Sequence, residues 1–380
     1  MTRLTLHIGD PKTGTSSIQG ALFNRRFECD SKTLDYPATL SAFMLANTLK
    51  KRRRASQKDQ RFADIAAWLA ASKADVAVIS AEQFSTVDPA TVLQAFQEFI
   101  PDHAESMRVV AYARPHVSRF LSAYAQRTKV GTLFSDLDSF FSEEKNANLL
   151  NFHSRFLKWR DLVGDRFVLR PMVRPELLDG DVVADFLGIV LEGAPFRILG
   201  EAESNSSLPM EPLSGLRLVH QVLRKFEIGE GTRQAVGSKI TTFVAAAGNK
   251  GTKLQPSKAL YAKLADYCMA DAEKLDRDFF GKPIMVSALV AAEKEAVDGN
   301  YSGQAKDFYP AEVVKVLRGH GRKLAKLFQT QPGIWDAAFR RERGQIAPLS
   351  PDEQTPEQAS AFVGRVNDTL AELAVVLTSG

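Results

Sequence analysis

Short apolar runs alternate with amphipathic segments through the first third of the chain. Residues 4–8 alternate apolar and polar side chains, and residues 75–80 and 107–113 are mostly apolar. Turn-forming or charged residues follow each run, as is typical of strands. Between them, residues 61–71 and 91–100 place apolar side chains at helical spacing. Strands that alternate with helices predict a parallel sheet with helices on its faces.

The later part of the chain is richer in helical patterns. The further expected helices cover residues 39–54, 116–129, 136–141, 148–163, 181–187, 286–297, 311–330 and 355–377, and residues 166–170 read as one more strand. We therefore expect an α/β domain over residues 1–285 and a helical C-terminal extension over 286–380. This extension could cover the site, contact a second copy of the chain or dock a partner.

Composition sets outer limits. The hydrophobic fraction of 44% and the charged fraction of 25% are ordinary for a globular protein. No run approaches the ~18 apolar residues of a membrane-spanning helix, and the two cysteines build no disulfide framework. We expect a cytoplasmic protein without a secretory signal. The net charge of +4 suits anionic ligands but does not indicate nucleic-acid binding.

The most informative segment follows the first expected strand. Residues 7–19 read His-Ile-Gly-Asp-Pro-Lys-Thr-Gly-Thr-Ser-Ser-Ile-Gln. A strand, a tight turn and a helix N-terminus bring backbone N–H groups together, and the helix dipole favours an anion there. Lys12 adds a positive charge, and nearby hydroxyl groups add donors. The segment predicts a phosphate-bearing ligand; a plain strand–turn–helix connection is the alternative.

The order of residues in this loop indicates which class of phosphate ligand it binds. Gly9 and Gly14 have the spacing of a nucleoside-triphosphate loop, but Thr15 occupies the lysine position and the lysine lies earlier, at Lys12. The run Pro-Lys-Thr-Gly-Thr-Ser-Ser resembles the 5′-phosphosulfate loop of sulfotransferases that use 3′-phosphoadenylyl sulfate (PAPS). The resemblance implies a P-loop-like three-layer fold. It also implies nucleotide contacts from Lys12, Thr13, Gly14, Thr15, Ser16 and Ser17.

A second segment resembles the 3′-phosphate motif of the same family. Arg114 ends a strand, Arg119 follows five residues later and Ser122 eight residues later. An arginine fork and a hydroxyl can grip a phosphate from two sides. The resemblance implies that Arg114 and Ser122 hold the 3′-phosphate, while Arg119 is open to a bracing role. Pro115 departs from the family pattern, and a solvated arginine with an ordinary helical serine is the alternative.

A third segment supplies a candidate base. Glu82 follows the strand at 75–80, and carboxyl ends of strands in an open α/β sheet are where ligands bind. The segment resembles the carbohydrate-type branch of the sulfotransferases, which includes bacterial members, and there the glutamate takes the proton of the acceptor hydroxyl. A surface glutamate that caps the next helix is the alternative. His7, inside the first strand, is expected to be a core residue.

Together the three segments imply transfer of a sulfuryl group from PAPS to a hydroxyl, most plausibly of a carbohydrate. Glu82 would act as base, and Lys12 would stabilise the leaving phosphate. The scheme needs no metal, and the cysteine and histidine spacings match no common metal motif. A P-loop nucleotide kinase or NTPase and a catalytically inactive nucleotide-binding protein are the alternatives.

Three further segments carry weaker signals. The basic residues 50–54 are interpreted as a solvated helix end, with an anionic acceptor as the functional alternative. Residues 250–253 resemble a lysine-glycine loop that closes over the nucleotide in some relatives. Residues 205–207 read as a polar loop, and residues 350–353 have the order of a capping box or form a linker.

Overall fold

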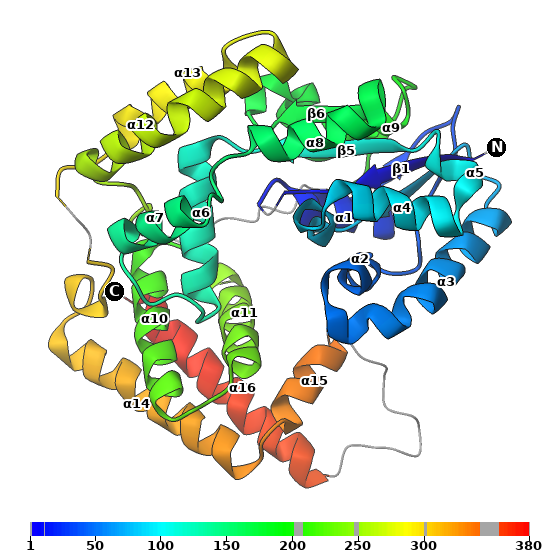
Figure 1. Cartoon of the computed structure of the whole chain (residues 1–380). Coiled ribbons are helices and arrows are strands. Elements are labelled where there is room, and N and C mark those ends of the chain that lie inside the picture. The colour runs from blue at the N-terminus through cyan, green and yellow to red at the C-terminus, as the bar shows by residue number, and fades with distance from the viewer. Residues whose placement is uncertain are drawn as a thin grey trace. The chain divides into compact units, whose positions relative to one another are not determined.

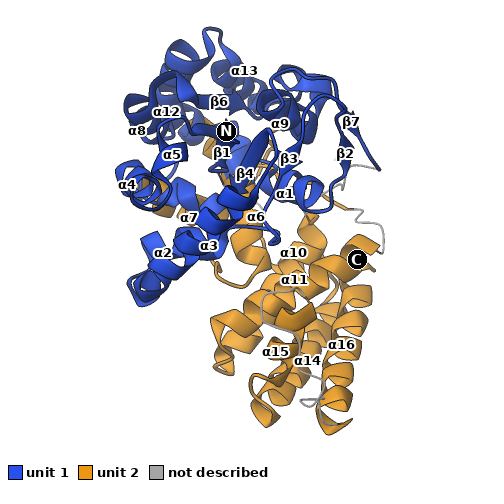
Figure 2. Ribbon diagram, turned by 90° about the vertical axis from the view of Figure 1, so that its right-hand side faces the viewer, with its two compact units in different colours: residues 1–119, 147–204, 263–294 blue, residues 120–146, 205–262, 295–380 orange. Residues whose placement is uncertain are grey.

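The computed structural model describes residues 2–10, 12–200, 208–246, 251–299, 302–342 and 357–379. The chain folds into two compact units, shown in Figure 2. The first unit comprises 1–119, 147–204 and 263–294, and the second comprises 120–146, 205–262 and 295–380.

The first unit is built on a parallel sheet (Figure 1). In the described residues its strands have the order β3-β4-β1-β5-β6. Their bounds are β1 (Arg3–His7), β3 (Leu34–Asp35), β4 (Val76–Ser80), β5 (Arg108–Ala113) and β6 (Phe167–Pro171), while β2 (Phe27–Glu28) and β7 (Arg197–Ile198) form a separate antiparallel pair. The expected parallel sheet is confirmed.

Helices cover both faces of this sheet. They are α1 (Thr15–Phe23), α2 (Phe43–Lys50), α3 (Lys58–Ala71), α4 (Pro89–Phe99), α5 (Pro101–Ala104), α8 (His153–Val163), α9 (Val182–Val190), α12 (Lys258–Leu275, which begins in the second unit) and α13 (Ile284–Ala291). Figure 2 shows α1 and α9 on one side of the sheet and α4, α5 and α8 on the other. This is the expected three-layer α/β arrangement.

Apolar burial holds the layers together. On the α1 side, Ile18 of α1 and Phe186 of α9 pack in one cluster with Val78 and Val110 of the sheet, and all four side chains are fully buried. Burying one such side chain contributes about 1.5–3 kcal/mol. β4 and β5 lie inside the sheet with both faces covered and read as largely apolar runs, whereas β1, also inside the sheet, carries the buried polar side chains Thr5 and His7.

The strand order contains a switch point between β1 and β5. The connection that leaves β1 leads to β3 on one side, and the connection that leaves β5 leads to β6 on the other side. Adjacent strands whose connections diverge leave a crevice beyond their carboxyl ends. His7, the last residue of β1, pairs with Ser80, the last residue of β4, and with Val110 of β5, which continues for three more residues to Ala113.

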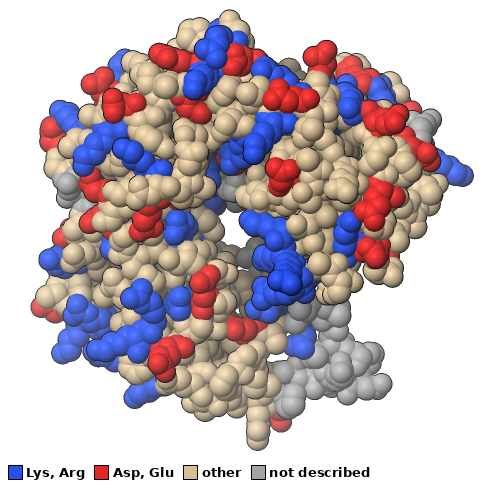
Figure 3. Space-filling view, viewed as in Figure 1, with Lys and Arg blue, Asp and Glu red and all other residues tan. Residues whose placement is uncertain are grey.

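One expected helix is divided in the structure. Instead of a helix over 39–54, α2 ends at Lys50, Lys51 is extended, and a 3-10 helix, η1 (Arg52–Gln57), follows. In a continuous helix, like charges three and four residues apart within residues 50–54 would lie side by side and repel one another, which favours the break. Figure 3 shows Lys and Arg side chains gathered where Figure 1 labels α2.

The second unit is helical in its described residues. It contains most of α6 (His116–Lys129), which the division crosses after Arg119, and α7 (Leu137–Asn146), α10 (Met210–Lys225), α11 (Glu230–Ala246), α14 (Ala311–Thr330), α15 (Ile334–Glu342) and α16 (Glu357–Thr378). A Cβ at Gly215 would lie 2.4 Å from Leu377, and a Cβ at Gly321 would lie 2.9 Å from Val222. Glycine therefore lets α10 approach both α16 and α14 closely.

This packing changes the expected domain boundary. The apolar faces of α14 and α16 pack against α10 and α11, so most of the C-terminal extension shares one core with residues 205–262. The division therefore differs from 1–285 and 286–380, although it falls near the expected point, after residue 294. Pro11, residues 205–207, Lys250 and residues 350–353 lie outside the described residues.

Candidate functional site

The loop between β1 and α1 has a backbone that depends on glycine. Gly14 caps α1 with a φ of 80°, and Lys12 has a φ of 73°. A Cβ on Gly9 would lie 2.1 Å from the Thr15 Oγ1 atom, closer than real contacts allow. A side chain at position 9 would therefore displace the first turn of the helix, and the two glycines permit a sharp turn into α1.

The N-terminus of α1 faces the end of this turn. The amides of Ser17 and Ile18 donate to the Gly14 carbonyl, at 3.0 and 3.1 Å, so helical bonding starts there. The N–H groups before Ser17 belong to the first turn, which leaves donors and a partial positive charge for an anion. Ser16 is exposed and Ser17 half-buried, while Thr15 is buried.

Thr13 has a different role from the one the sequence suggests. Its hydroxyl donates to the Asp10 carbonyl at 2.6 Å, and its amide donates to the same oxygen at 3.3 Å. The side chain is fully buried. Thr13 therefore closes the turn, and its hydroxyl is not directed at a ligand.

Asp10 is a buried carboxylate that sequence reasoning left without a role. Its oxygens lie 3.3 Å from Nε of Arg119 and 3.0 Å from Nη2 of Arg155. Arg155, on α8, also lies over the rings of Phe152 and Phe156. Asp10 therefore ties the loop to α6 and α8. Arg119, for which a bracing role was open, braces the loop through Asp10.

Arg114 joins the two sequence motifs. It follows β5, and its Nη1 donates to the Lys12 carbonyl oxygen at 2.8 Å, while its Nε donates to Ser118 Oγ at 3.0 Å. Burial, and then the positive charge of Arg119, lower the pKa of Arg114. Ser122 is buried in the part of α6 that belongs to the second unit, so its joint action with Arg114 stays a prediction.

Glu82 and Lys12 are close enough for the charge of each to shift the pKa of the other. Glu82 is the first residue of the 3-10 helix η2 (Glu82–Thr86), directly after β4 and Ala81. Burial raises the pKa of Glu82, and the Lys12 ammonium acts in the opposite direction. Burial likewise lowers the pKa of Lys12, opposed by the Glu82 carboxylate. Each group therefore stabilises the charged form of the other, against the effect of burial.

His7 lies behind the loop, in the core, as expected. Its Nδ1 is 2.9 Å from Ser80 Oγ, which also accepts a hydrogen bond from Gln19 at 3.1 Å. Burial lowers the pKa of His7 to about 3, so the ring stays neutral. This network ties the ends of β1 and β4 to α1, and it holds Glu82 in register with the loop.

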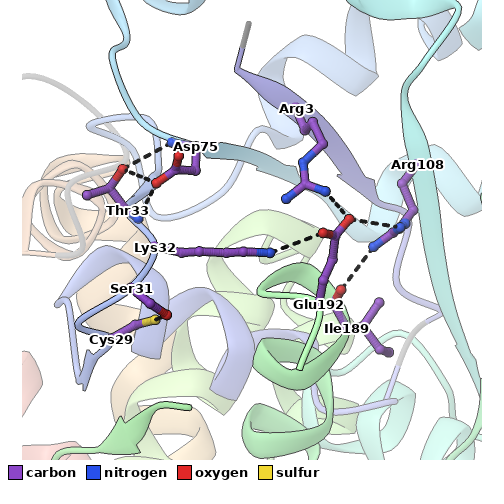
Figure 4. A network of polar contacts seen from close by, with 9 residues as sticks. All are labelled: Arg3, Cys29, Ser31, Lys32, Thr33, Asp75, Arg108, Ile189 and Glu192. Carbon is purple, nitrogen blue, oxygen red and sulfur yellow. Dashed lines mark hydrogen bonds and ion pairs between the residues drawn. The ribbon is translucent and has the colours of Figure 1, made fainter. Parts of the chain in front are cut away.

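A recess of about 620 Å³ lies at the opposite edge of the sheet, beside the amino ends of the strands. Its charges are largely used: Arg3 and Lys32 pair with Glu192, and Asp75 accepts from Thr33 (Figure 4). Since polar groups that already have partners offer little to a ligand, we place the candidate site at the carboxyl edge, where the motifs converge.

No protein-family model, curated protein or solved structure matches this chain. In the described part of the chain, no helix is both long and apolar enough to cross a bilayer.

Proposed function

We propose that the protein is a PAPS-dependent sulfotransferase that acts on a hydroxyl group of a carbohydrate. One observation carries the proposal. Lys12, Glu82 and Arg114 follow three neighbouring strands, and the Arg114 guanidinium donates to the Lys12 carbonyl at 2.8 Å. Residues singled out by resemblance to one nucleotide site therefore occupy one edge of one sheet.

The loop is suited to the 5′-end of the nucleotide. The first-turn amides of α1 and the hydroxyls of Ser16 and Ser17 would hold the 5′-phosphate, with Thr15 and Gly14 shaping the turn. Lys12 would lie against the oxygen that bridges phosphate and sulfate. By the resemblance, Arg114 and Ser122 would hold the 3′-phosphate.

The reaction is an in-line transfer. The acceptor oxygen forms a bond to sulfur while the bond between sulfur and the 5′-phosphate oxygen breaks. The acceptor proton passes to Glu82, and adenosine 3′,5′-bisphosphate leaves with its new negative charge beside Lys12. Positioning and charge stabilisation supply most of the rate, as in phosphoryl transfer.

The kinase alternative is less well supported. A kinase or NTPase of the P-loop type needs a Ser or Thr hydroxyl after the loop lysine to hold magnesium. The residue after Lys12 is Thr13, whose buried hydroxyl already donates to the Asp10 carbonyl. The lysine position after Gly14 is occupied by Thr15.

A thermal-shift comparison tests the nucleotide. Adenosine 3′,5′-bisphosphate should raise the melting temperature, and ATP with magnesium should not. The reverse preference would favour the kinase. The Glu82→Gln variant then separates an enzyme from an inactive binding protein: it should keep nucleotide affinity and lose on the order of 10²–10⁴-fold in transfer rate. Wild-type protein without transfer activity on any carbohydrate hydroxyl would favour the inactive scaffold.

A further inference from the structure

The proposed function leaves the basic run unexplained. We define the basic run as Lys50–Arg54, the end of α2 and the start of η1. The side chains of Lys50, Lys51, Arg52 and Arg53 are exposed, and Arg54 is half-buried. Five cations thus follow one another at the surface, where their mutual repulsion works against the compact fold.

Among the described residues, the last four cations of the basic run have no acidic partner. In the ranges that the structure describes, no carboxylate pairs with the side chains from Lys51 to Arg54. Elsewhere in the same unit, cations are commonly paired: Arg170 with Asp185, for example, at 2.6 Å. A concentrated positive surface without paired carboxylates in the described part of the chain favours an anionic ligand.

The basic run begins at a residue that contacts the 3-10 helix starting with the candidate base. At the start of α2, the amide of Ala42 donates to the carbonyl of Ser80, the last residue of β4, at 2.9 Å. At its end, the Lys50 ammonium donates to Thr86 Oγ1 at 2.8 Å. Thr86 lies four residues after Glu82 in η2. A 3-10 helix rises by about 2 Å per residue, so roughly 8 Å of helix separates the two.

We propose that the basic run binds an anionic polysaccharide, the acceptor whose hydroxyl is presented to Glu82. This inference rests on the proposed function, since it names the acceptor class of the same site. A chain that carries carboxylate or sulfate groups can contact several cations of the basic run while one of its hydroxyls reaches the carboxylate.

The local sequence favours a polysaccharide over a nucleic acid. Residues 50–58 read Lys-Lys-Arg-Arg-Arg-Ala-Ser-Gln-Lys and contain no aromatic side chain. Proteins that bind single-stranded nucleic acid generally stack bases on aromatic rings. The cations also lie at a helix end and in one short 3-10 helix, rather than along a helix face that could enter a duplex groove.

Polyanion binding is measured on the full chain by titration with dextran sulfate, alginate, neutral dextran and a 20-base-pair DNA. The test variant is Lys51→Gln, Arg52→Gln, Arg53→Gln. Its charge-matched control is Lys73→Gln, Lys158→Gln, Lys274→Gln, three exposed lysines of the same unit. A second control, Arg52→Lys with Arg53→Lys, keeps the charge.

Wild-type protein should bind dextran sulfate and alginate, ignore neutral dextran and lose affinity as salt rises. The test variant should bind roughly tenfold more weakly and with a smaller salt dependence, while both controls stay near wild type. Equal losses in the test and charge-matched variants would overturn the proposal, as would a lack of polysaccharide binding. Tighter binding of DNA would assign the surface to nucleic acid instead.

The nucleotide is measured separately, so that the two proposals can fail independently. Adenosine 3′,5′-bisphosphate should stabilise the test variant as much as the wild type, because the basic run lies outside the nucleotide loop. A protein that binds alginate but not this nucleotide would refute the sulfotransferase proposal. Binding of an anionic polysaccharide by the basic run would still stand. A protein that binds the nucleotide but not the polysaccharide would refute only the acceptor class.

Discussion

The guanidinium of Arg114 donates a hydrogen bond to the backbone carbonyl of Lys12, two residues that lie 102 positions apart in the chain. The bond joins the residue that follows β5 to the loop after β1, so it holds that loop against the carboxyl end of the sheet. The same guanidinium also donates to Ser118 Oγ at 3.0 Å, so one side chain links the loop after β1 to the first turn of α6.

Replacement of Arg114 by lysine should weaken the nucleotide site. Lysine keeps the charge but lacks the planar fork that reaches both the Lys12 carbonyl and Ser118. We expect affinity for adenosine 3′,5′-bisphosphate, measured by calorimetry, to fall by about 10- to 100-fold. Ser118→Ala removes only one partner and should cost much less. Unchanged affinity in Arg114→Lys would contradict the bracing role.

The pKa of Glu82 should depend on Lys12. Burial raises this pKa and the Lys12 ammonium lowers it, so Lys12→Met should raise it further. A carbon-13 NMR titration of the Glu82 carboxyl group in both proteins reads this without an acceptor. Because a base must be ionised, transfer should rise with pH through the same midpoint. Identical midpoints in the two proteins would show that the charges do not interact.

Asp10→Asn should destabilise the first unit. The change leaves the Arg119 and Arg155 guanidinium groups beside a neutral amide. Removing one partner of a buried ion pair typically lowers the free energy of unfolding by about 3–5 kcal/mol, and by less where the remaining charges reach solvent. Urea unfolding measures the loss. Arg197→Gln breaks the exposed pair with Glu28 and should change stability much less, because solvent screens that pair. Comparable losses would indicate that Asp10 is not a tie between loop and helices.

Gly9→Ala should disturb the loop, because its Cβ would meet Thr15 Oγ1 at 2.1 Å. We expect a lower melting temperature and weaker nucleotide binding. The second change in Gly9→Ala, Thr15→Ala removes that oxygen and should restore part of the stability. Gly319→Ala is the control: it lies within α14 and a Cβ there has nothing within 4 Å, so it should be neutral or stabilising. A harmless Gly9→Ala would refute the close contact.

Glu192 should make stability depend on pH. Arg3 and Lys32 donate to it and lower its pKa from 4.5 to about 2. Because the folded pKa is depressed, the contribution is present above the ordinary pKa and is lost as pH falls from about 4.5 towards 2. Wild type should therefore exceed Glu192→Gln in urea midpoint at pH 6, and the difference should shrink by pH 3. A difference that is constant over this range would refute the linkage.

Much of the fold could be predicted because its signals are local. Apolar runs marked β1, β4 and β5 to within about one residue, and α6 has the expected bounds, His116–Lys129. The break after Lys50 was missed, since helical patterning does not show how strongly a run of like charges opposes an α-helix.

The candidate site was predictable only in part. Lys12, Glu82 and Arg114 could be chosen as site residues because each follows a recognisable turn or strand end in the sequence. Arg155 could not, because nothing in the pattern of α8 distinguishes an arginine that reaches a buried carboxylate from a solvated one. Asp10 lay inside the motif, and only its burial shows that it is an ion-pair partner rather than a turn former.

The sequence alone determined the strands β1, β4, β5 and β6, the helix α6 and the glycine-containing loop, because backbone preference and hydrophobic period act over a few residues. Tertiary structure alone decided that Asp10 receives two arginines, that Thr13 turns inward, and that helices from both ends of residues 205–380 share one core. These contacts join residues far apart in the chain, and their formation depends on how the layers pack rather than on any local preference.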